Sequence, residues 1–227
     1  SFLFILRGKY HRMAIVAPSL LAADFLKLEE TCKMLNESEA DWFHLDVMDG
    51  RFVPNISFGP MIIEFIRKTT KKICDVHLMI VEPEKYTETF KKVGADHLTV
   101  HIEACPHLHR NIQQIKSLGM KAGVAINPHT PVNSLIDIIQ DIDQVVLMTV
   151  NPGFGGQEFI PHSLTKIREL RKLISNWNLP VDIVIDGGVT VENASDIIAA
   201  GANVLVAGST VFKAHDPKAV IAQLKKL

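Results

Sequence analysis

The sequence predicts an α/β protein that folds as a single (β/α)8 barrel, and three observations support this. Apolar runs such as 145–150 and 204–207 are typical of strands buried on both faces of a parallel sheet. Gly94 and Gly201 each precede such a run and lie 107 residues apart, which matches four repeat units of about 27 residues. Eight units of that length need about 215 residues, which is close to the 227 residues of the chain.

The expected strands recur along the whole chain. They are largely apolar and rich in β-branched residues, as central strands of a covered sheet are. Gly94 and Gly201 are interpreted as helix C-caps, where a positive φ favours glycine, and each leads directly into a strand. The strands are expected at 14–19, 42–47, 73–79, 96–101, 121–126, 144–150, 182–186 and 203–207.

Helical patterns fill the intervals between these strands. They are expected at 24–37, 60–70, 84–93, 108–118, 131–140, 163–176, 191–200 and 216–226. Pro131 and Pro217 lie near the start of two of them, where a proline costs no helix hydrogen bond. Eight alternating pairs favour a closed barrel, although a doubly wound open sheet has the same kind of alternation.

The overall composition is that of an ordinary folded enzyme. Hydrophobic residues make up 47% of the chain and charged residues 22%, and the formal net charge is −1. This charge predicts neither nucleic acid nor a membrane surface as a partner.

Cys32, Cys74 and Cys105 form no C-x-x-C pair and are interpreted as free thiols in a reducing compartment, so we expect a cytoplasmic protein. No apolar run approaches the roughly 18 residues that suggest a membrane span.

Residues 1–12 differ from the rest of the chain. An apolar run at 2–6 precedes the basic residues Arg7, Lys9 and Arg12, whereas a signal peptide has its basic residues first. We therefore expect residues 1–12 to be an N-terminal extension of unknown origin and residues 13–227 to form the catalytic barrel domain. A transit-peptide remnant and upstream vector sequence fit this segment about equally well, and the first of these would make an organelle stroma the expected location.

Polar residues collect at three of the expected strand ends, where a barrel of this type has its active site. Alternation places His44 and Asp46 of the second strand on one face. His77 ends the third strand in the same way, and Asp186 ends the seventh. Two imidazoles and two carboxylates suit one divalent metal ion per chain, Zn²⁺ first and Fe²⁺, Mn²⁺ or Co²⁺ as alternatives. Separate hydrogen bonding of each residue is the competing interpretation, but buried aspartates beside histidines need a common partner.

Glycine clusters follow the last three expected strands. Glycines allow backbone N–H groups to converge on a phosphate, and loops after the seventh and eighth strands often bind phosphate in such barrels. One cluster alone would indicate only a tight turn, whereas three in succession favour a phosphate site. The clusters are 153–156, 187–188 and 208–209.

Other residues near the strand ends have two possible roles. Met48, Met79 and Met148 either pack in the barrel mouth or line the site as polarizable groups beside a delocalised anion. Ser19, after the first strand, either donates a hydrogen bond to a substrate or caps a turn. His97 and His101 on the fourth strand can be assigned neither to the site nor to the core from their positions alone.

Several of these segments resemble ribulose-phosphate 3-epimerases. The resemblance runs from about Ile15 to the C-terminus and falls in order on nearly every strand end. Ala22 departs from it, standing where many members have serine, and His129 lies in a loop that often lacks histidine. The matching segments are APSLL at 17–21, HLDVMDGRFVPN at 44–55, DVHLM at 75–79, MTVNPGFGGQ at 148–157, DGG at 186–188 and VAGS at 206–209.

The resemblance implies a TIM barrel of the ribulose-phosphate-binding type that acts as an isomerase in pentose phosphate metabolism. The implied reaction interconverts D-ribulose 5-phosphate and D-xylulose 5-phosphate at C3, through an enediolate stabilised by the metal ion. Asp46 would accept the proton and Asp186 donate one, with exchanged roles in reverse, because one base cannot reach both faces of C3. A homo-oligomer is implied as well.

Carried over residue by residue, the metal ligands are His44, Asp46, His77 and Asp186. Met48, Met79 and Met148 would line the intermediate. The residues that would contact the sugar phosphate are Ser19, His77, Gly153, Phe154, Gly155, Gly156, Asp186, Gly187, Gly188, Gly208 and Ser209.

Three other functions remain open from the sequence. An epimerase of a six-carbon ketose phosphate, such as D-allulose 6-phosphate, would use the same chemistry. Decarboxylases and aldol-type lyases of similar build use an Asp-x-Lys-x-x-Asp arrangement, but segment 75–80 carries His77 and no lysine. A phosphate-binding scaffold without activity would be expected to lack an acid or a metal ligand, and all four residues are present.

Overall fold

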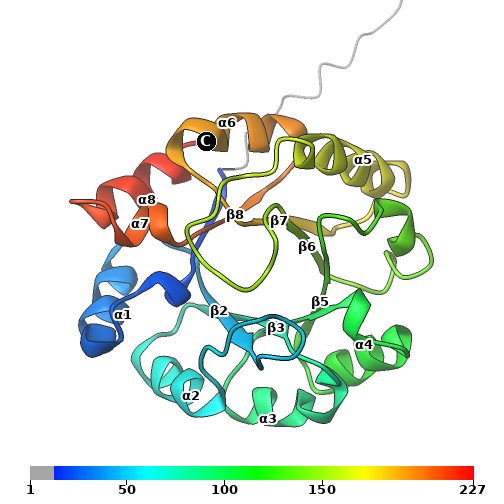
Figure 1. The fold of residues 1–227 in the computed structure, drawn as a ribbon, viewed down its shortest axis with the longest axis horizontal. Coiled ribbons are helices and arrows are strands. Elements are labelled where there is room, and N and C mark those ends of the chain that lie inside the picture. The colour runs from blue at the N-terminus through cyan, green and yellow to red at the C-terminus, as the bar shows by residue number, and fades with distance from the viewer. Residues whose placement is uncertain (1–12) are drawn as a thin grey trace, which may run out of the picture.

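The computed structural model describes residues 13–227, so the expectation for residues 1–12 lies outside the described part of the chain. Eight parallel strands curl into a ring, and helices pack around its outside (Figure 1). Each strand lies within two residues of its expected range. The strands are β1 (Ile15–Pro18), β2 (Trp42–Met48), β3 (Ile73–Met79), β4 (His97–His101), β5 (Lys121–Ile126), β6 (Gln144–Met148), β7 (Asp182–Asp186) and β8 (Val204–Ala207).

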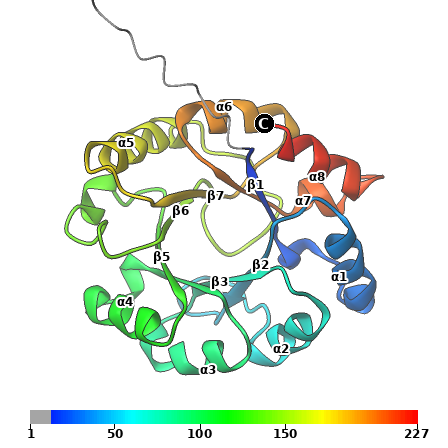
Figure 2. The same cartoon turned by 180° about the vertical axis from the view of Figure 1, so that it is seen from behind.

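The ring closes between β1 and β2. Around the rest of the ring, neighbouring strands pair in the order β1-β8-β7-β6-β5-β4-β3-β2, and every pair is parallel. Ser19 and His44 form a parallel bridge, and the Asp41 N–H donates to the carbonyl of Val16 at 2.9 Å. Seen from behind, the strands surround the centre of the molecule (Figure 2). The prediction of a barrel is therefore confirmed, and the doubly wound open sheet is excluded.

The helices follow the strands as expected, with short 3₁₀ turns at several junctions. Gly94 and Gly201 have φ values of 102° and 121°, which confirms the prediction that glycine ends the helices before β4 and β8. The α-helices are α1 (Leu28–Glu37), α2 (Pro60–Thr69), α3 (Thr87–Lys92), α4 (Leu108–Ser117), α5 (Ser163–Asn176), α6 (Val191–Ala200), α7 (Ser209–Phe212) and α8 (Pro217–Lys225). The 3₁₀ turns are η1 (Leu20–Ala22), η2 (Phe25–Lys27), η3 (Pro83–Lys85), η4 (Ile102–Ala104) and η5 (Val132–Leu135).

Two helical elements differ from the expectation. The helix predicted at 131–140 is wrong, because this segment forms only η5 and a run of turns. Asn133 and Ser134 favour local turns over helix, and the isoleucines that follow are β-branched. No sequence pattern predicts the four-residue helix α7, since it is too short to show a helical period.

Alternation along the strands separates two apolar layers. Leu45 and Val47 of β2 belong to the large cluster between the strands and the surrounding helices. Trp42 of the same strand belongs instead to the cluster inside the barrel, with Val146 and Val184. His44 and Asp46 are in register with Trp42 and therefore point inward. Within residues 13–227, no helix has the length and apolar character needed to cross a membrane.

Candidate active site

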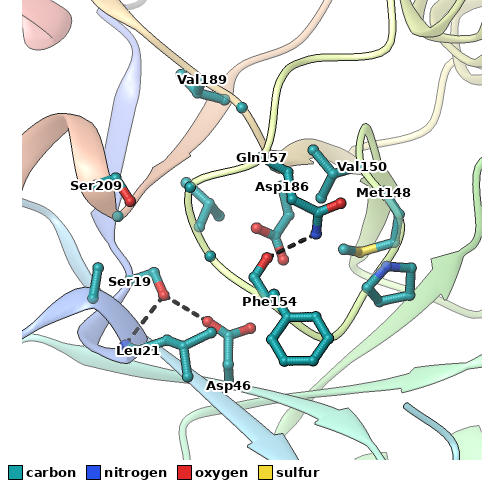
Figure 3. A pocket seen from close by; sticks show the side chains of 18 of the residues that line it. Ser19, Leu21, Asp46, Met148, Val150, Phe154, Gln157, Asp186, Val189 and Ser209 are labelled. Atoms are coloured by element: carbon teal, nitrogen blue, oxygen red, sulfur yellow. Dashed lines mark hydrogen bonds between the residues drawn. The ribbon is translucent and has the colours of Figure 1, made fainter. Parts of the chain in front are cut away.

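A cavity of about 390 Å³ opens at the carboxyl ends of the strands. The segment after β6 lies over the centre of the ring in Figure 1 and forms one side of this cavity. Figure 3 shows Asp46 and Asp186 facing the cavity from different elements. His44 and His77 are completely buried and do not line the cavity. The sequence-predicted residues that line it are Ser19, Asp46, Met48, Met79, Met148, Gly153, Phe154, Gly155, Gly156, Asp186, Gly187, Gly188, Gly208 and Ser209.

The structure brings the four predicted ligands together. Asp46 and His77 are direct partners in the register of β2 and β3, while Asp186 comes from β7. His44 Nε2 lies 3.2 Å from Asp46 Oδ1 and 3.5 Å from Asp186 Oδ2. His77 Nδ1 lies 3.3 Å from each of the same two oxygens. One atom of each side chain thus falls in a group that spans no more than 4.8 Å.

This group of atoms fits a divalent cation. His44 Nε2 and His77 Nδ1 are buried and have no hydrogen-bond partner, which is costly unless another group occupies the space between them and the carboxylates. Ligand atoms around a tetrahedral ion with bonds of about 2.0–2.1 Å lie roughly 3.3–3.4 Å apart. The measured separations of 3.2–3.5 Å between the histidine nitrogens and carboxylate oxygens agree with that spacing.

The electrostatics of the cluster also favour a cation. Burial opposes protonation of His44, but Asp46, Asp186 and Asp75 raise its pKa well above the usual value. His77 behaves similarly, since burial is outweighed by Asp186 and Asp46, which raise its pKa. Burial favours the neutral form of Asp46, yet His44 and His77 lower its pKa. Burial and the charge of Asp46 act against ionised Asp186, but the same histidines lower its pKa. The carboxylates therefore attract positive charge to this point.

His44 is oriented by a carboxylate that the sequence did not identify. His44 Nδ1 lies 2.7 Å from Asp75 Oδ2, and the other oxygen of Asp75 accepts a hydrogen bond from Gln144 Nε2 at 2.8 Å. A proton on Nδ1 leaves His44 Nε2 free to face the cluster, as in many carboxylate–histidine–metal arrangements. Alternation offered a signal for this role, because Asp75 precedes His77 by two residues and shares its face.

His101 is the second functional neighbour that sequence reasoning left unassigned. Its ring is completely buried, and its Nε2 lies 2.9 Å from His77 Nε2. Burial lowers the pKa of His101 to about 4, against the opposing effect of Glu103. The signal in the sequence that could have identified His101 is its position at the end of β4, on the face that points into the barrel.

Ser19 and three methionines also line the cavity. The Ser19 hydroxyl donates to Asp46 Oδ2 at 2.6 Å and accepts from the Leu21 N–H at 3.4 Å, as the dashed lines in Figure 3 show. Met48 and Met79 form a small buried cluster with Val53, and Met148 packs in the inner layer of the barrel. The three methionines therefore line the same cavity as the two carboxylates, while Asp46 Oδ1 remains directed at the histidines.

The glycine clusters line the same cavity, and Gly208 lies next to Ser19. Gly156, Gly187 and Gly188 have φ values of 75°, 116° and 66°, which side chains rarely adopt. Asn55 Nδ2 donates to the carbonyl of Gly153 at 2.8 Å, so the loop after β2 holds the loop after β6. Gly155 has open space around it, whereas a side chain at Gly188 would meet the backbone of Phe159.

Comparisons with known proteins show what the chain resembles in sequence and in fold. A family model described as the ribulose-phosphate 3 epimerase family matches residues 15–212. A ribulose-phosphate 3-epimerase of Synechocystis is 53% identical over 93% of this chain and 93% of its own length. The chloroplastic ribulose-5-phosphate-3-epimerase of Arabidopsis thaliana is 50% identical over 93% of this chain and 76% of its own. A mutant tryptophan synthase α-subunit of Pyrococcus furiosus shares the fold, with a TM-score of 0.70 at 16% identity over 95% and 98% of the two chains.

Proposed function

The chain belongs to the ribulose-phosphate 3-epimerase family, and on that basis we propose that it interconverts D-ribulose 5-phosphate and D-xylulose 5-phosphate. Relatives at 42–53% identity carry the name ribulose-phosphate 3-epimerase. The observation that carries the proposal is the pair Asp46 and Asp186, which face one cavity and share two buried histidines. The activity is that of an isomerase.

The two aspartates have the placement that inversion at C3 requires. Inversion removes a proton from one face of the carbon and returns a proton to the other, so two groups on different sides are needed. Asp46 comes from β2 and Asp186 from β7, and β1 and β8 separate these strands in the ring. Each carboxylate directs one oxygen to the histidine cluster, and the other oxygen of Asp186 is available to the substrate. In one direction Asp46 takes the proton and Asp186 supplies one; in reverse the roles exchange.

His44, Asp46, His77 and Asp186 would hold one divalent metal ion, and Zn²⁺ suits the two nitrogens and two oxygens. When bound, such an ion stabilises the negative charge that develops on the substrate oxygens next to C3. Ser19 keeps Asp46 in place through its hydrogen bond and can reach a substrate oxygen from the same position. Phe154 and the loop after β6 cover the cavity, which limits the access of water to the carbanion.

The phosphate end would lie against the glycine clusters. Glycines let backbone N–H groups approach a phosphate closely, and the formal net charge of −1 gives the chain as a whole no positive charge to attract an anion. Gly155, Gly188 and Gly208 line this end of the cavity together with Ser209. Binding energy at the phosphate can then position the reacting carbon beside the carboxylates.

The proposed function is tested by NMR of ribulose 5-phosphate mixed with the purified protein. Xylulose 5-phosphate should appear until the two epimers reach equilibrium. Allulose 6-phosphate, offered under the same conditions, should react more slowly. Preferential turnover of the six-carbon sugar would reassign the substrate while leaving the chemistry intact, and turnover of neither would contradict the proposal.

Phosphate recognition gives a separate prediction. Gly155→Leu should raise KM by roughly tenfold with little change in kcat, the effect of losing about 1.4 kcal/mol of binding free energy. The reason is that the new side chain is added to a loop that lines the cavity, and no atom lies within 4 Å of its Cβ, so the fold itself is not strained. Gly59→Leu is the matched control, since Gly59 also has open space and lies outside the cavity. Steady-state kinetics measure both, and an unchanged KM in Gly155→Leu would show that this loop is only a turn.

We also propose a homo-oligomer that works in the cytoplasm or in an organelle stroma. Membership of the family supports the first of these proposals, and association would cover some of the exposed apolar side chains, such as Leu26, Ile56 and Met61. Buried free thiols at all three cysteines support a reducing compartment. The molecular mass in solution is the measurement for the first of these proposals.

A further inference from the structure

A line of hydrogen-bonding groups leads from His77 away from the cavity. His77 Nε2 lies 2.9 Å from His101 Nε2, and His101 Nδ1 lies 3.1 Å from Glu103 Oε2. The two imidazole planes are within 20° of parallel with centroids 5.0 Å apart, a geometry in which they meet edge to edge through their nitrogens. The other oxygen of Glu103 accepts from the Asn127 N–H at 2.8 Å and from the Thr130 hydroxyl. We call His77, His101 and Glu103 the histidine relay.

The direction of each hydrogen bond in the histidine relay follows from Glu103, the last residue of the relay. A backbone N–H can only donate, so Glu103 serves as an acceptor toward Asn127. As a carboxylate it also accepts from His101, which places the proton of a neutral His101 on Nδ1. His101 Nε2 then has a lone pair and must accept, so that the proton of His77 lies on its Nε2.

From this geometry we propose that His101 and Glu103 are positioning residues that fix the tautomer of His77 and leave its Nδ1 free for a cation. The inference rests on the proposed metal site. His77 Nδ1 is the buried atom without a hydrogen-bond partner that faces Asp46 and Asp186. If the relay ran in the opposite direction, a proton on Nδ1 would occupy the place between the carboxylates.

The surroundings of the relay are built to keep it in one arrangement. The ring of Phe52 packs against His101, with the ring centroids 4.6 Å apart. The Phe52 N–H donates a hydrogen bond to Asp49 Oδ1 at 2.9 Å, which fixes the loop that carries Phe52. On the other side, Lys166 Nζ donates to the carbonyls of Asn127, Pro128 and Thr130 at 3.0, 2.9 and 2.7 Å. Segment 127–130, which donates hydrogen bonds to Glu103, is therefore itself held in place by the buried ammonium group of Lys166.

The two histidine ligands are thus set by different means. His44 receives a carboxylate directly, since Asp75 lies 2.7 Å from its Nδ1. His77 is separated from its carboxylate by a neutral imidazole, and it uses the opposite ring nitrogen. Groups that orient ligating histidines in this way typically change metal affinity by about 10–100-fold when they are removed.

Glu103→Gln tests the proposal because it retains the size of the side chain and reverses the polarity of the relay. The amide oxygen is kept by the Asn127 N–H, so the NH₂ group faces His101 Nδ1 and donates to it. His101 must then carry its proton on Nε2, and His77 must accept there and carry its own proton on Nδ1. Zn²⁺ affinity, measured by competition with a chromophoric chelator, should fall by roughly 10–100-fold. Thr130→Val, which removes a hydrogen bond to Glu103 without reversing the relay, should bind Zn²⁺ within about threefold of the wild type, less than the tenfold lower limit of a lost orienting group.

Equal Zn²⁺ affinity in Glu103→Gln and the wild type would overturn the relay, as would equal losses in Glu103→Gln and Thr130→Val. Absence of Zn²⁺ binding to the wild type would instead overturn the metal site itself. A second measurement needs no variant: ¹H–¹⁵N correlation of the imidazole rings in the Zn²⁺-loaded wild type. The proton should be found on Nε2 of His77 and on Nδ1 of His101, and either proton on the other nitrogen would contradict the proposal.

Discussion

Asp186→Asn should slow epimerisation by roughly 10²–10⁴-fold, the usual contribution of a general acid or base. Asparagine has nearly the shape of aspartate but cannot take up or release a proton at neutral pH. Asp186 faces the cavity from β7, so its loss leaves one face of C3 without a proton donor. The rate of xylulose 5-phosphate formation, followed by NMR, measures this loss directly.

The Asp186→Asn variant should still exchange the C3 proton of one epimer with solvent, although it inverts C3 slowly. In D₂O, Asp46 can still remove the C3 proton of one epimer and return deuterium to the same face, so exchange continues without inversion. Asp46→Asn should show the mirror behaviour with the other epimer. In the wild type, by contrast, the newly formed epimer should carry a solvent-derived deuteron, because the donor equilibrates with water before each turnover.

Two controls make this result interpretable. Both aspartates are proposed metal ligands, so the metal content of each variant must be measured beside its rate. Asp196→Asn makes the same substitution on the exposed face of α6 and should leave the rate unchanged. A metal-replete Asp186→Asn protein that epimerises near the wild-type rate would show that Asp186 is not the donor.

Removal of the metal ion should abolish turnover. Treatment with a strong chelator leaves the negative charge on the substrate oxygens without its stabilising partner, and Zn²⁺, Fe²⁺, Mn²⁺ or Co²⁺ should restore activity. His77→Ala should lower metal content and rate together, since it removes a ligand and leaves two carboxylates uncompensated. Metal analysis and kinetics on the same samples measure both effects.

His109→Ala is the matched control for this substitution. The His109 side chain is 60% exposed and lies outside the ligand cluster, so its loss should change neither metal content nor rate. Full activity in protein shown to be free of metal would rule out the assigned role of the four ligands.

The barrel could be predicted because its strands are buried on both faces. Near-continuous apolar runs and glycines with positive φ at the helix ends mark the repeat clearly, and Gly94 and Gly201 have that conformation. The segment after β5 could not be predicted in the same way. Its apolar residues have a helical spacing, but Asn133 and Ser134 favour local turns, and the chain forms η5 instead.

The proximity of the four proposed ligands could be predicted from the sequence, because alternation along the strands directs all four side chains inward at the strand ends. The groups that set their protons were harder to find. The contact of His44 with Asp75 depends on ring orientation across two neighbouring strands, and that of His77 with His101 depends on which ring edges meet. Such contacts are set by rotamers and by packing of the surrounding loops, which residue spacing does not encode.

The ligand cluster joins walls of the barrel that are not neighbours. Asp186 stands on β7, while the other three ligands stand on β2 and β3, and the strands themselves share no hydrogen bonds across that gap. A bound ion would therefore act as a brace across the ring and would neutralise carboxylates that otherwise repel one another. Because a ligand that binds only the folded state stabilises it, resistance to heat and catalytic competence would then depend on the same four side chains. A substitution that loosens the ion should weaken both properties at once, so selection for activity would also maintain the thermal stability of the barrel.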